Sequence, residues 1–504
     1  MKMTSRISLS LNKFRTAAAL LLVAGTTASN VFGWTTPEYW ISTTPLSGGS
    51  HVGTMDDPFD GSTQSAFDSA MNSSTLAGAT LHLMGGTYTT KGSASGGWTA
   101  KNGIHLLGAG IGVTTIKFAS GSPAGTYAIE NGSSSDSNIT VADLTIDGTG
   151  TTNVDGIYLL GSELNVRRVE VKNLTYTTGS SLFAIHFYNS ASAASIGNNI
   201  NDCLVSGITG ACNAIFCVGN SSGYMTVNIL NNSITYSGNY SNALEGINIY
   251  YTDKSIISGN RVTGGQIPVF INSGPNSNLI ISYNHLDNCQ YGILFINSGA
   301  NQQNVMMAYN NIGLAYVTGY GALGYNGSGG LYLANGSSYS NICFIGNTLR
   351  FDTSAGTTPY AVVTYNTTGL TIANNTIDSG FGFVIDSSSS NVNQYNNVDL
   401  TGAFITAANQ IDLPNGLTRR TVTASDTLSY TNHYVGVQGN SLTLTLPSAA
   451  SFGGKELVVV MESGTGTTTI SAPSGQTING LSSVSLAVHT GTNIVSDGSN
   501  WYAH

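Results

Sequence analysis

The sequence feature that most constrains the fold is a short recurring phrase, in which an apolar-x-apolar strand leads into Asn-x-(Ile, Leu or Val). Its clear copies begin at Asn198, Asn232, Asn260, Asn284, Asn310, Asn347, Asn375 and Asn396, 21 to 37 residues apart, and degenerate copies precede them at Ala142 and Arg167. Repetition at such a period indicates a solenoid, in which each unit buries its apolar face only against its neighbours.

A second phrase, a small residue followed by apolar-x-apolar, lies between copies of the first. It begins at Gly156, Ala184, Ala214, Gly246, Gly292 and Gly330. Together the phrases predict three short strands per repeat, with alternating inward side chains and each backbone paired to the next coil. Asparagine suits the sharp turn between strands because it tolerates left-handed backbone and bonds its neighbours. We therefore expect Asn232, Asn260 and Asn284 to form a ladder.

These repeats, which cover residues 75–415, resemble the right-handed parallel β-helix of the pectate-lyase-like superfamily. The segment Leu107-Gly-Ala-Gly110 followed by Thr114-Thr-Ile116 is similar to the first coil of that superfamily. Residues 34–74 are similar to the entry segment that precedes this coil. The resemblance implies an all-β chain. It does not imply one activity, because lyases, hydrolases, esterases, tailspikes and adhesins share this fold.

The tail of the chain, residues 416–504, has a different pattern. Alternating strands separated by Gly, Asn and Ser turns predict a small antiparallel β-sandwich. The order of its phrases is similar to the C-terminal domains of phage tail fibres and tailspikes. That resemblance implies a capping or oligomerisation domain and a homotrimer.

The first 33 residues have the pattern of a bacterial secretory signal peptide. A basic stretch precedes the apolar run AAALLLVA at residues 17–24, and small residues follow. The run is too short to span a bilayer, and no later segment reaches 18 apolar residues. We therefore expect an exported protein, extracellular or on the cell surface, without a membrane span. Five cysteines, an odd and sparse set, imply no disulfide framework.

Charged residues are scarce, at 8% of the chain, and the formal net charge is −9. Without the four basic residues of the leader, 12 Lys and Arg face 25 Asp and Glu, which gives −13. Nucleic acid and anionic membranes are poor partners for such a surface. No Lys or Arg occurs at residues 173–253 or 262–349, whereas a lyase acting on uronates must neutralise a carboxylate. The motifs typical of polygalacturonases and pectate lyases are also missing from the sequence.

The outer side of the strand in the second phrase is predicted to be apolar and aromatic. Its residues include Tyr158, His186, Phe216, Tyr250, Phe270 and Tyr332. Such an exterior needs a cover. Two interpretations stay open: the rings stack on sugar, or loops or further subunits of the same protein cover them.

Carboxylates are the other candidate site residues, because glycosidic hydrolysis usually requires two of them roughly 5–9 Å apart. The position three residues after the asparagine holds Arg350, Asp378 and Asp399 on successive coils, which predicts Asp378 and Asp399 about 5 Å apart. The alternative is an Arg350–Asp378 surface ion pair. Glu245, beside the strand that contains Tyr250, is a second candidate.

Other polar positions favour structural roles. Asp147 and Lys172 fall at equivalent positions of adjacent coils and predict an ion pair. The sequence has no Cys/His spacing typical of zinc, and we expect neither a metal nor a cofactor.

Two functions follow from these patterns. The favoured one is a secreted, trimeric, adhesin-like β-helix that binds an extracellular polysaccharide without catalysis. The alternative is a glycoside hydrolase that uses Asp378 and Asp399 or Glu245; a polysaccharide lyase is less favoured.

Overall fold

The computed structural model describes residues 36–177, 182–236, 244–296, 301–315, 329–334, 337–352, 360–378, 383–385, 389–400, 411–413, 417–428, 434–451 and 456–504. The predicted signal peptide, residues 1–33, lies outside the described residues. Among the described helices, none is long and apolar enough to cross a membrane.

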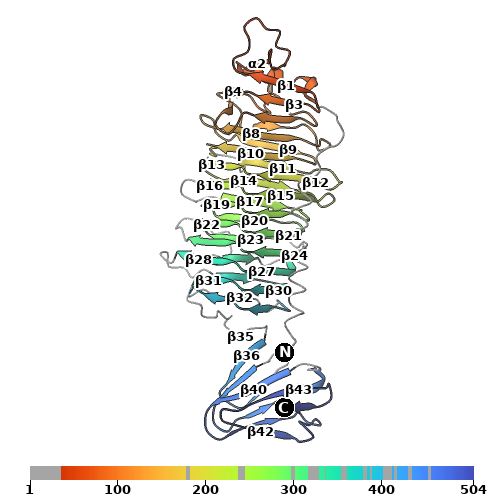
Figure 1. The fold of residues 1–504 in the computed structure, drawn as a ribbon, viewed down its shortest axis with the longest axis vertical. Coiled ribbons are helices and arrows are strands. Elements are labelled where there is room, and N and C mark those ends of the chain that lie inside the picture. Colours follow the sequence, from red (N-terminus) through yellow and green to blue (C-terminus); the bar gives the residue numbers. More distant parts are fainter. Residues whose placement is uncertain are drawn as a thin grey trace. The chain divides into compact units, whose positions relative to one another are not determined.

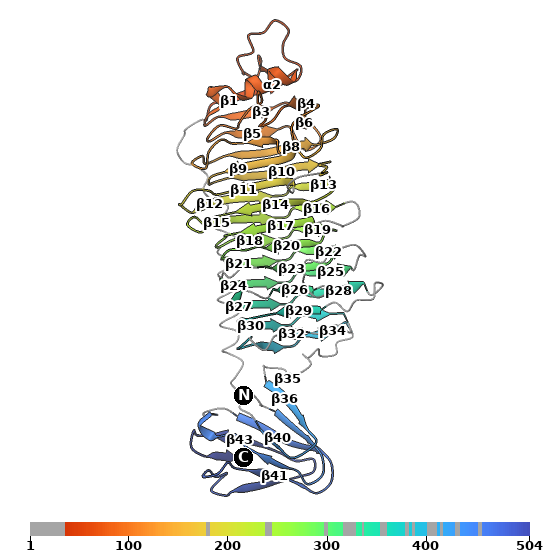
Figure 2. The same cartoon turned by 180° about the vertical axis from the view of Figure 1, so that it is seen from behind.

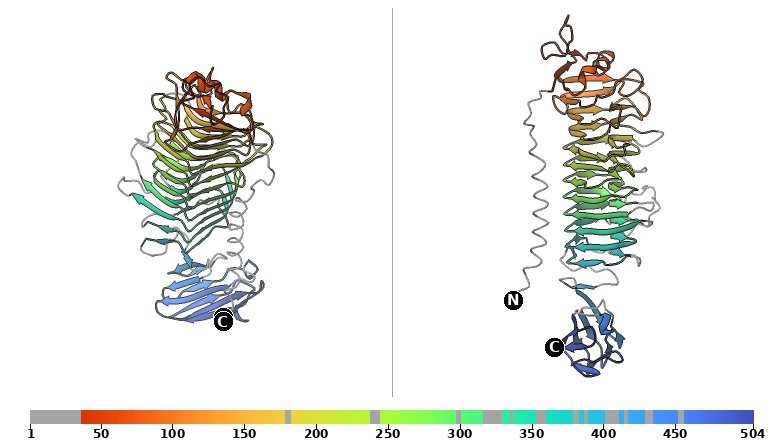
Figure 3. Two further views of the ribbon diagram at one scale, coloured as in Figure 1. Left: turned by 45° about the horizontal axis from the view of Figure 1, so that its top comes forward. Right: turned by 90° about the vertical axis from the view of Figure 1, so that its right-hand side faces the viewer.

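The repeats form a right-handed parallel β-helix, as predicted, in which the strands of successive coils stack one above another (Figures 1 and 2). A full coil contributes three strands, and in chain order they form three faces that we call A, B and C. The sharp asparagine turn lies between faces A and B. The side view in Figure 3 shows the coils stacked edge to edge.

Face A contains β1 (Glu38–Ser42), β2 (Phe59–Asp60), β3 (Thr80–Leu83), β5 (His105–Gly108), β12 (Ser195–Asn201), β15 (Met225–Leu230), β18 (Ile256–Ser258), β21 (Ser277–Ser282), β24 (Asn301–Ala308), β27 (Ser338–Ile345), β30 (Thr367–Ala373) and β33 (Asn393–Tyr395). Face B contains β4 (Gly86–Thr90), β6 (Thr114–Phe118), β13 (Leu204–Ile208), β16 (Ser233–Tyr236), β19 (Arg261–Thr263), β22 (His285–Cys289), β25 (Asn311–Ala315), β28 (Thr348–Asp352), β31 (Thr376–Ile377) and β34 (Val398–Asp399). The long strands β8 (Thr140–Asp147) and β10 (Asn165–Lys172) span both faces.

Face C contains β7 (Tyr127–Glu130), β9 (Asp155–Leu160), β11 (Leu182–Tyr188), β14 (Cys212–Val218), β17 (Leu244–Tyr250), β20 (Ile267–Ile271), β23 (Tyr291–Phe295), β26 (Gly329–Leu333), β29 (Tyr360–Thr364) and β32 (Phe383–Ile385). The inward side chains of all three faces form one continuous apolar core. Its members are mainly Ile, Val and Leu, which suit strands that are buried on one side and stacked in register.

The N-terminal coil is covered by the short helix α2 (Gln64–Met71), followed by the 3-10 turn η1 (Ser74–Leu76) (Figure 1). The side chain of Thr63 caps the helix by accepting from the amide of Ala66. Phe67 and Met71 point into the core and are fully buried. The helix thus shields the apolar end of the solenoid from water.

Buried asparagines form the predicted ladder at the turn between faces A and B. In each step the Oδ1 atom of one asparagine accepts from both the amide N–H and the Nδ2 group of the asparagine one coil earlier. The ladder is longer than expected and consists of Asn232, Asn260, Asn284, Asn310, Asn347, Asn375 and Asn397. All seven side chains are buried.

The structure corrects three details of this prediction. The ladder position of the last coil is Asn397, one residue beyond the predicted Asn396. Asn198 lies inside β12 and accepts from the amide of Leu164, and Cys203 donates its amide to the ladder instead. The left-handed residue is also not the ladder asparagine but the one before it, because the ladder side chain must point inward while the chain turns outward.

The C-terminal residues 411–504 form two sheets with a shared apolar core. One sheet contains β35 (Ile411–Leu413), β36 (Leu417–Val422), β38 (Tyr434–Gln438), β40 (Glu456–Ser463), β43 (Gly491–Ser496) and β44 (Trp501–Ala503). The other contains β37 (Asp426–Thr427), β39 (Thr443–Thr445), β41 (Thr467–Ser471) and β42 (Ser483–Ala487), and the 3-10 turn η3 (Ala449–Ser451) follows β39.

The predicted antiparallel pairing of this module is only partly correct, because both sheets are mixed. Strands β36, β38 and β40 pair in parallel, as do β37, β39 and β41, and the remaining pairs are antiparallel. The chain alternates between the two sheets from β36 to β41, so successive strands of one sheet run in the same direction. The alternation of apolar and polar residues shows which side of a strand is buried, but it does not show whether the adjacent strand is parallel or antiparallel.

Candidate functional site

The outer side of face C carries the column of residues that the second phrase predicts. Strand pairing aligns Tyr158, His186, Phe216, Asn248, Phe270, Leu294 and Tyr332 on successive coils. A second column, two residues further along each strand, contains Tyr188, Val218 and Tyr250. The isoleucines between the columns, such as Ile157 and Ile185, point inward and are fully buried.

The N-terminal half of face C is an aromatic ladder. The ring centroids of Tyr127 and Tyr158 lie 4.8 Å apart, those of Tyr158 and His186 4.6 Å, and those of His186 and Phe216 4.9 Å. The ring of Phe183 stacks on Phe216 at 5.2 Å with an interplanar angle of 11°. Apart from His186, these rings are only half-buried, so part of each ring faces outward.

The imidazole of His186 is enclosed by this ladder. Its exposed fraction is 9%, and neither ring nitrogen has a hydrogen-bond partner among the described residues. Burial lowers the pKa of His186 to about 3, because the charged imidazolium would lose its hydration without gaining a counter-ion. His186 is therefore a neutral member of the aromatic stack at ordinary pH, rather than an acid or base.

Two carboxyl groups border the ladder. Asp155 accepts a hydrogen bond of 2.6 Å from the amide of Phe183, and burial raises its pKa to about 7. Glu245 accepts from Nδ2 of Asn248 at 2.6 Å, and burial raises its pKa to about 7 as well. Asn248 also donates to Oδ1 of Asn213 at 2.8 Å. Both carboxyl groups can therefore gain or lose a proton near neutral pH.

The two carboxyl groups are too far apart to act on one glycosidic bond. Strand pairing aligns Asp155, Phe183, Asn213 and Glu245 on four successive coils. Three inter-strand steps of about 4.8 Å place Asp155 and Glu245 roughly 14 Å apart. Paired catalytic carboxyls lie roughly 5–9.5 Å apart, so this face holds two separate acids.

Four residues of this face were not predicted from the sequence: Tyr127, Asp155, Phe183 and Asn213. Asp155, Phe183 and Asn213 come directly before the small residue of the second phrase, and Tyr127 is paired with Asp155. All four lie three residues before the outward column of face C. Strict alternation would place such a position on the inner side. The contacts of Phe183 with His186 and of Asn213 with Asn248 show that both positions share the outer side.

The C-terminal half of face C is closed. Phe270, Leu294 and Tyr332 form an apolar cluster outside the main core, with exposed fractions of 6%, 0% and 2%. Rings this deeply buried offer no surface to a sugar. Among the predicted aromatic residues, Tyr158, Phe216 and Tyr250 are thus half-exposed, whereas Phe270 and Tyr332 are buried.

The structure does not align Asp378 with Asp399 as predicted. Pairing of β31 with β34 aligns Asp399 with Ile377, and Asp378 follows the end of β31. The predicted register of the two aspartates is therefore displaced by one residue. The error has the same origin as the ladder error, since the anchor of the last coil is Asn397 and not Asn396.

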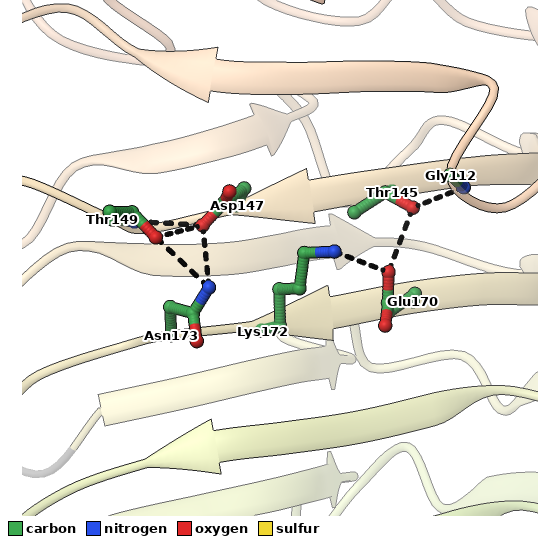
Figure 4. Close-up of polar contacts among 7 residues, drawn as sticks. All are labelled: Gly112, Thr145, Asp147, Thr149, Glu170, Lys172 and Asn173. Atoms are coloured by element: carbon green, nitrogen blue, oxygen red, sulfur yellow. Dashed lines mark hydrogen bonds and ion pairs between the residues drawn. The ribbon is translucent and has the colours of Figure 1, made fainter.

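Figure 4 shows a polar cluster on face B of the first coils. Lys172 aligns with Asp147, but its Nζ atom pairs with Glu170 at 3.0 Å instead. Asp147 accepts from Asn173 at 3.0 Å and from the Thr149 hydroxyl at 2.6 Å. The predicted alignment of Asp147 with Lys172 is therefore correct, but the predicted ion pair between them does not form, because uncharged donors already satisfy Asp147.

Among the described residues, no group of three or more His, Cys, Asp or Glu side chains could hold a metal ion. All five cysteines are free thiols, and Cys203, Cys212, Cys217 and Cys289 are buried in the solenoid.

No known protein family matches the chain, and no relative is found among curated proteins. The chain is similar in structure to the A-module of the mannuronan C-5 epimerase AlgE4 of Azotobacter vinelandii, with 17% identity, a TM-score of 0.35, and coverage of 73% of this chain and 98% of that one. It is also similar to the Streptococcus pneumoniae surface protein and adhesin PfbA, with 15% identity, a TM-score of 0.40, and coverage of 67% and 92%.

A third similar structure is the DFA-IIIase of Arthrobacter chlorophenolicus A6 without its lid, with 13% identity, a TM-score of 0.44, and coverage of 74% and 97%. At these identities the similarities concern the fold alone and carry no information about the activity of this chain.

Proposed function

We propose that the protein binds a neutral extracellular polysaccharide through the N-terminal half of face C, without cleaving it. The observation that carries the proposal is the half-exposed aromatic ladder of Tyr127, Tyr158, Phe183 and Phe216 around the neutral His186. Stacked rings cover one another's faces, so their outward edges form an apolar strip along the solenoid, against which the C–H groups of a sugar chain can pack. The repeat of the solenoid supplies one ring position per coil along the polymer.

The charge pattern favours a neutral polymer. The described strands of face C contain no Lys or Arg, so nothing on this face can neutralise a uronate or a sulfate. Asp155 and Glu245 have raised pKa values of about 7, so both are largely protonated in mildly acidic solution. Asp155 and Asn248 have exposed fractions of only 4% and 2%, so they support the ladder from beneath and do not themselves contact the polymer.

The experiment is affinity electrophoresis of the purified protein in gels that contain xyloglucan, galactomannan or mixed-linkage β-glucan, with polygalacturonate and alginate as acidic counterparts. We expect retardation by at least one neutral polymer. The substitutions Tyr158→Ala and Phe216→Ala should reduce it, whereas Tyr502→Ala, an exposed tyrosine of the C-terminal module, should not. Retardation by the acidic polymers alone would contradict the proposal.

Secretion and trimeric assembly are part of the proposal. The leader pattern of residues 1–33 supports export, and the resemblance of the C-terminal module to tailspike caps supports three copies. Light scattering of the purified protein should give three times the mass of the exported chain. A monomer in dilute solution would contradict the trimer and leave the polysaccharide site untouched.

Glycoside hydrolysis is the second candidate function, and Glu245 is the residue that favours it. A carboxyl whose pKa is raised to about 7 is suited to protonate a leaving group. A hydrolase would require a partner carboxylate closer than Asp155. In that case polysaccharide cleavage should disappear in Glu245→Gln and persist in Asp378→Asn.

A further inference from the structure

A second aromatic surface lies on face B, at the turn that precedes the ladder asparagines. Tyr283 and Tyr309 have exposed fractions of 65% and 54%, and their rings stack at 5.3 Å with an interplanar angle of 17°. Both have left-handed backbone, with φ of 57° and 59°. Side chains larger than Gly or Asn are disfavoured there, and other coils carry Gly259 or Asn374 at the same position. The ring of Tyr309 packs over Gly346 of the next coil, yet more than half of each tyrosine remains exposed.

A pocket of about 270 Å³ opens at the other end of the same strands. It is lined by Asp287, Asn288, Gly313, Leu314, Ala315, Arg350 and Phe351, from β22, β25 and β28. Gly313 makes the pocket possible, because a Cβ atom there would lie 2.3 Å from Oδ1 of Asp287. The carboxylate of Asp287 thus lies across the space that a side chain at position 313 would fill. The volume fits a single sugar ring better than a drug-sized ligand, which occupies roughly 300–1,000 Å³.

Groups of opposite charge face the pocket. Strand pairing aligns Gly313 with Arg350, and a bulge in β22 of the preceding coil places the side chain of Asp287 beside Gly313. Asp287 also lies 3.8 Å from Nε2 of His285. Arg350 is exposed and forms no ion pair within the part of the chain that the structure describes. The backbones of Asp287 and Arg350 are thus two inter-strand steps, about 10 Å, apart, and the carboxylate of Asp287 extends over Gly313 toward the strand of Arg350.

The tyrosines and the pocket belong to one continuous surface. Tyr283 lies at the turn that leads into β22, and His285 and Asp287 follow it at alternate positions of that strand. The next coil repeats the pattern with Tyr309, Asn311 and Gly313, and Asn311 Nδ2 lies 3.3 Å from Nδ1 of His285. A ligand that packs against the tyrosines can therefore reach the pocket by lying along the strands.

We propose that this surface of face B is a second binding site, separate from face C, and that its ligand is a neutral oligosaccharide. One sugar packs against the exposed part of the Tyr283–Tyr309 pair, and another places its hydroxyl groups between Asp287 and Arg350. A hydroxyl both donates and accepts, so it satisfies the carboxylate and the guanidinium in turn. A uronate would be attracted by Arg350 but repelled by the negative charge of Asp287. An amino sugar would be attracted by Asp287 but repelled by Arg350.

The experiment is isothermal titration of the full-length protein with the hexasaccharides of cellulose, starch amylose, xylan and mannan, and with hexagalacturonate. We expect a neutral hexasaccharide to bind at a site that the double substitution Tyr283→Ala/Tyr309→Ala weakens about tenfold or more. Gly313→Ala should weaken binding similarly, because the added Cβ atom displaces the carboxylate of Asp287. The backbone φ of Gly313 is ordinary, so the substitution adds no backbone strain. Arg350→Ala should also weaken binding. Phe216→Ala on face C should leave this site unchanged.

Several outcomes would overturn the inference. Failure of every neutral hexasaccharide to bind, or an isotherm unchanged by the tyrosine substitutions, would exclude the site. Loss of binding in Tyr158→Ala and Phe216→Ala alone would leave the proposed face C function standing and the face B site wrong. Tighter binding of hexagalacturonate, lost in Arg350→Ala, would contradict the neutral ligand class. Unchanged thermal unfolding of each variant shows that the fold is retained.

Discussion

The Nδ2 atom of Asn284 lies 2.9 Å from the Oδ1 atom of Asn310 on the following coil, and the Oδ1 atom of Asn284 accepts from Asn260 on the preceding one. Each member of the ladder thus joins two coils at the tightest turn of the solenoid. Nδ2 of Asn284 also satisfies the buried main-chain carbonyl of Ile257.

Replacing one member should therefore cost more than one hydrogen bond. Asn284→Ala leaves the amide and Nδ2 of Asn260 and the carbonyl of Ile257 without their partner in a buried site. We expect a loss of roughly 2–5 kcal/mol in the free energy of unfolding, measured by guanidinium denaturation. Asn301→Ala is the matched control, because Asn301 lies at an exposed position of face A with ordinary backbone and should change stability by less than about 1 kcal/mol. Equal losses in both variants would contradict the role of burial.

The stability of the fold should depend on pH through Asp155 and Glu245. Burial raises both pKa values to about 7, from ordinary values of 3.8 and 4.5. Between about pH 4 and pH 7 the unfolded chain has released these protons while the folded chain retains them. The free energy of unfolding should therefore be highest near pH 4 and fall as the pH rises to 7, by up to roughly 3–4 kcal/mol per group.

Substitution of Glu245 isolates its share of this dependence. Glu245→Gln cannot ionise and still accepts from Asn248. The variant should match the wild type near pH 4 and exceed it in stability at pH 8. Glu456→Gln, at an exposed position of the C-terminal module, should follow the wild-type profile. A Glu245→Gln profile parallel to that of the wild type over the whole range would show that Glu245 ionises normally in the folded state.

The cysteine thiols should differ in reactivity according to burial. Burial raises the pKa of Cys203 to about 12, and the pKa values of Cys212, Cys217 and Cys289 are raised as well. The thiolate is the reactive species, so these four residues should resist iodoacetamide in the native protein. Cys343 on face A is half-exposed and should be modified first, as measured by peptide mass spectrometry. Rapid native modification of Cys212 or Cys217 would mean that the solenoid opens locally.

Calcium should not stabilise the polar cluster of face B. The Oε2 atom of Glu170 is already held by Nζ of Lys172 and the hydroxyl of Thr145, each at 3.0 Å (Figure 4). Asp147 accepts from Thr149 and Asn173. A divalent cation would have to displace an ammonium group and three neutral donors. Thermal unfolding in millimolar Ca²⁺ and in EDTA should therefore coincide, and a rise of several degrees with Ca²⁺ would reveal a cation site.

The sequence predicts the solenoid well because its repeat is a packing requirement. An asparagine at the turn and an apolar triplet on each strand recur wherever coils must stack, so the aligned column from Tyr158 to Tyr332 could be placed on face C from the phrase alone. Register errors arise where the signal is ambiguous. In the last coil two adjacent asparagines, Asn396 and Asn397, fit the phrase, and the wrong choice displaced the predicted register of Asp399 by one residue.

The candidate site was only partly predictable. Phe183 and Asn213 share the outer side with residues three positions away, which a strict period of two does not allow. Tyr283 and Tyr309 precede the ladder asparagine at a left-handed position, so no strand pattern marks them as exposed. The partners of Lys172 and the pocket at Gly313 depend on side-chain packing between coils, which no local pattern records.

If the proposal is correct, the protein holds a neutral polysaccharide and leaves it intact. The most direct test retains the polymer on the immobilised protein, recovers it, and measures new reducing ends together with absorbance from unsaturated uronates. We predict retention of a neutral polymer, reduced by Tyr158→Ala and Phe216→Ala, with no new ends and no unsaturation. Absence of retention, or new reducing ends that disappear in Glu245→Gln, would contradict it.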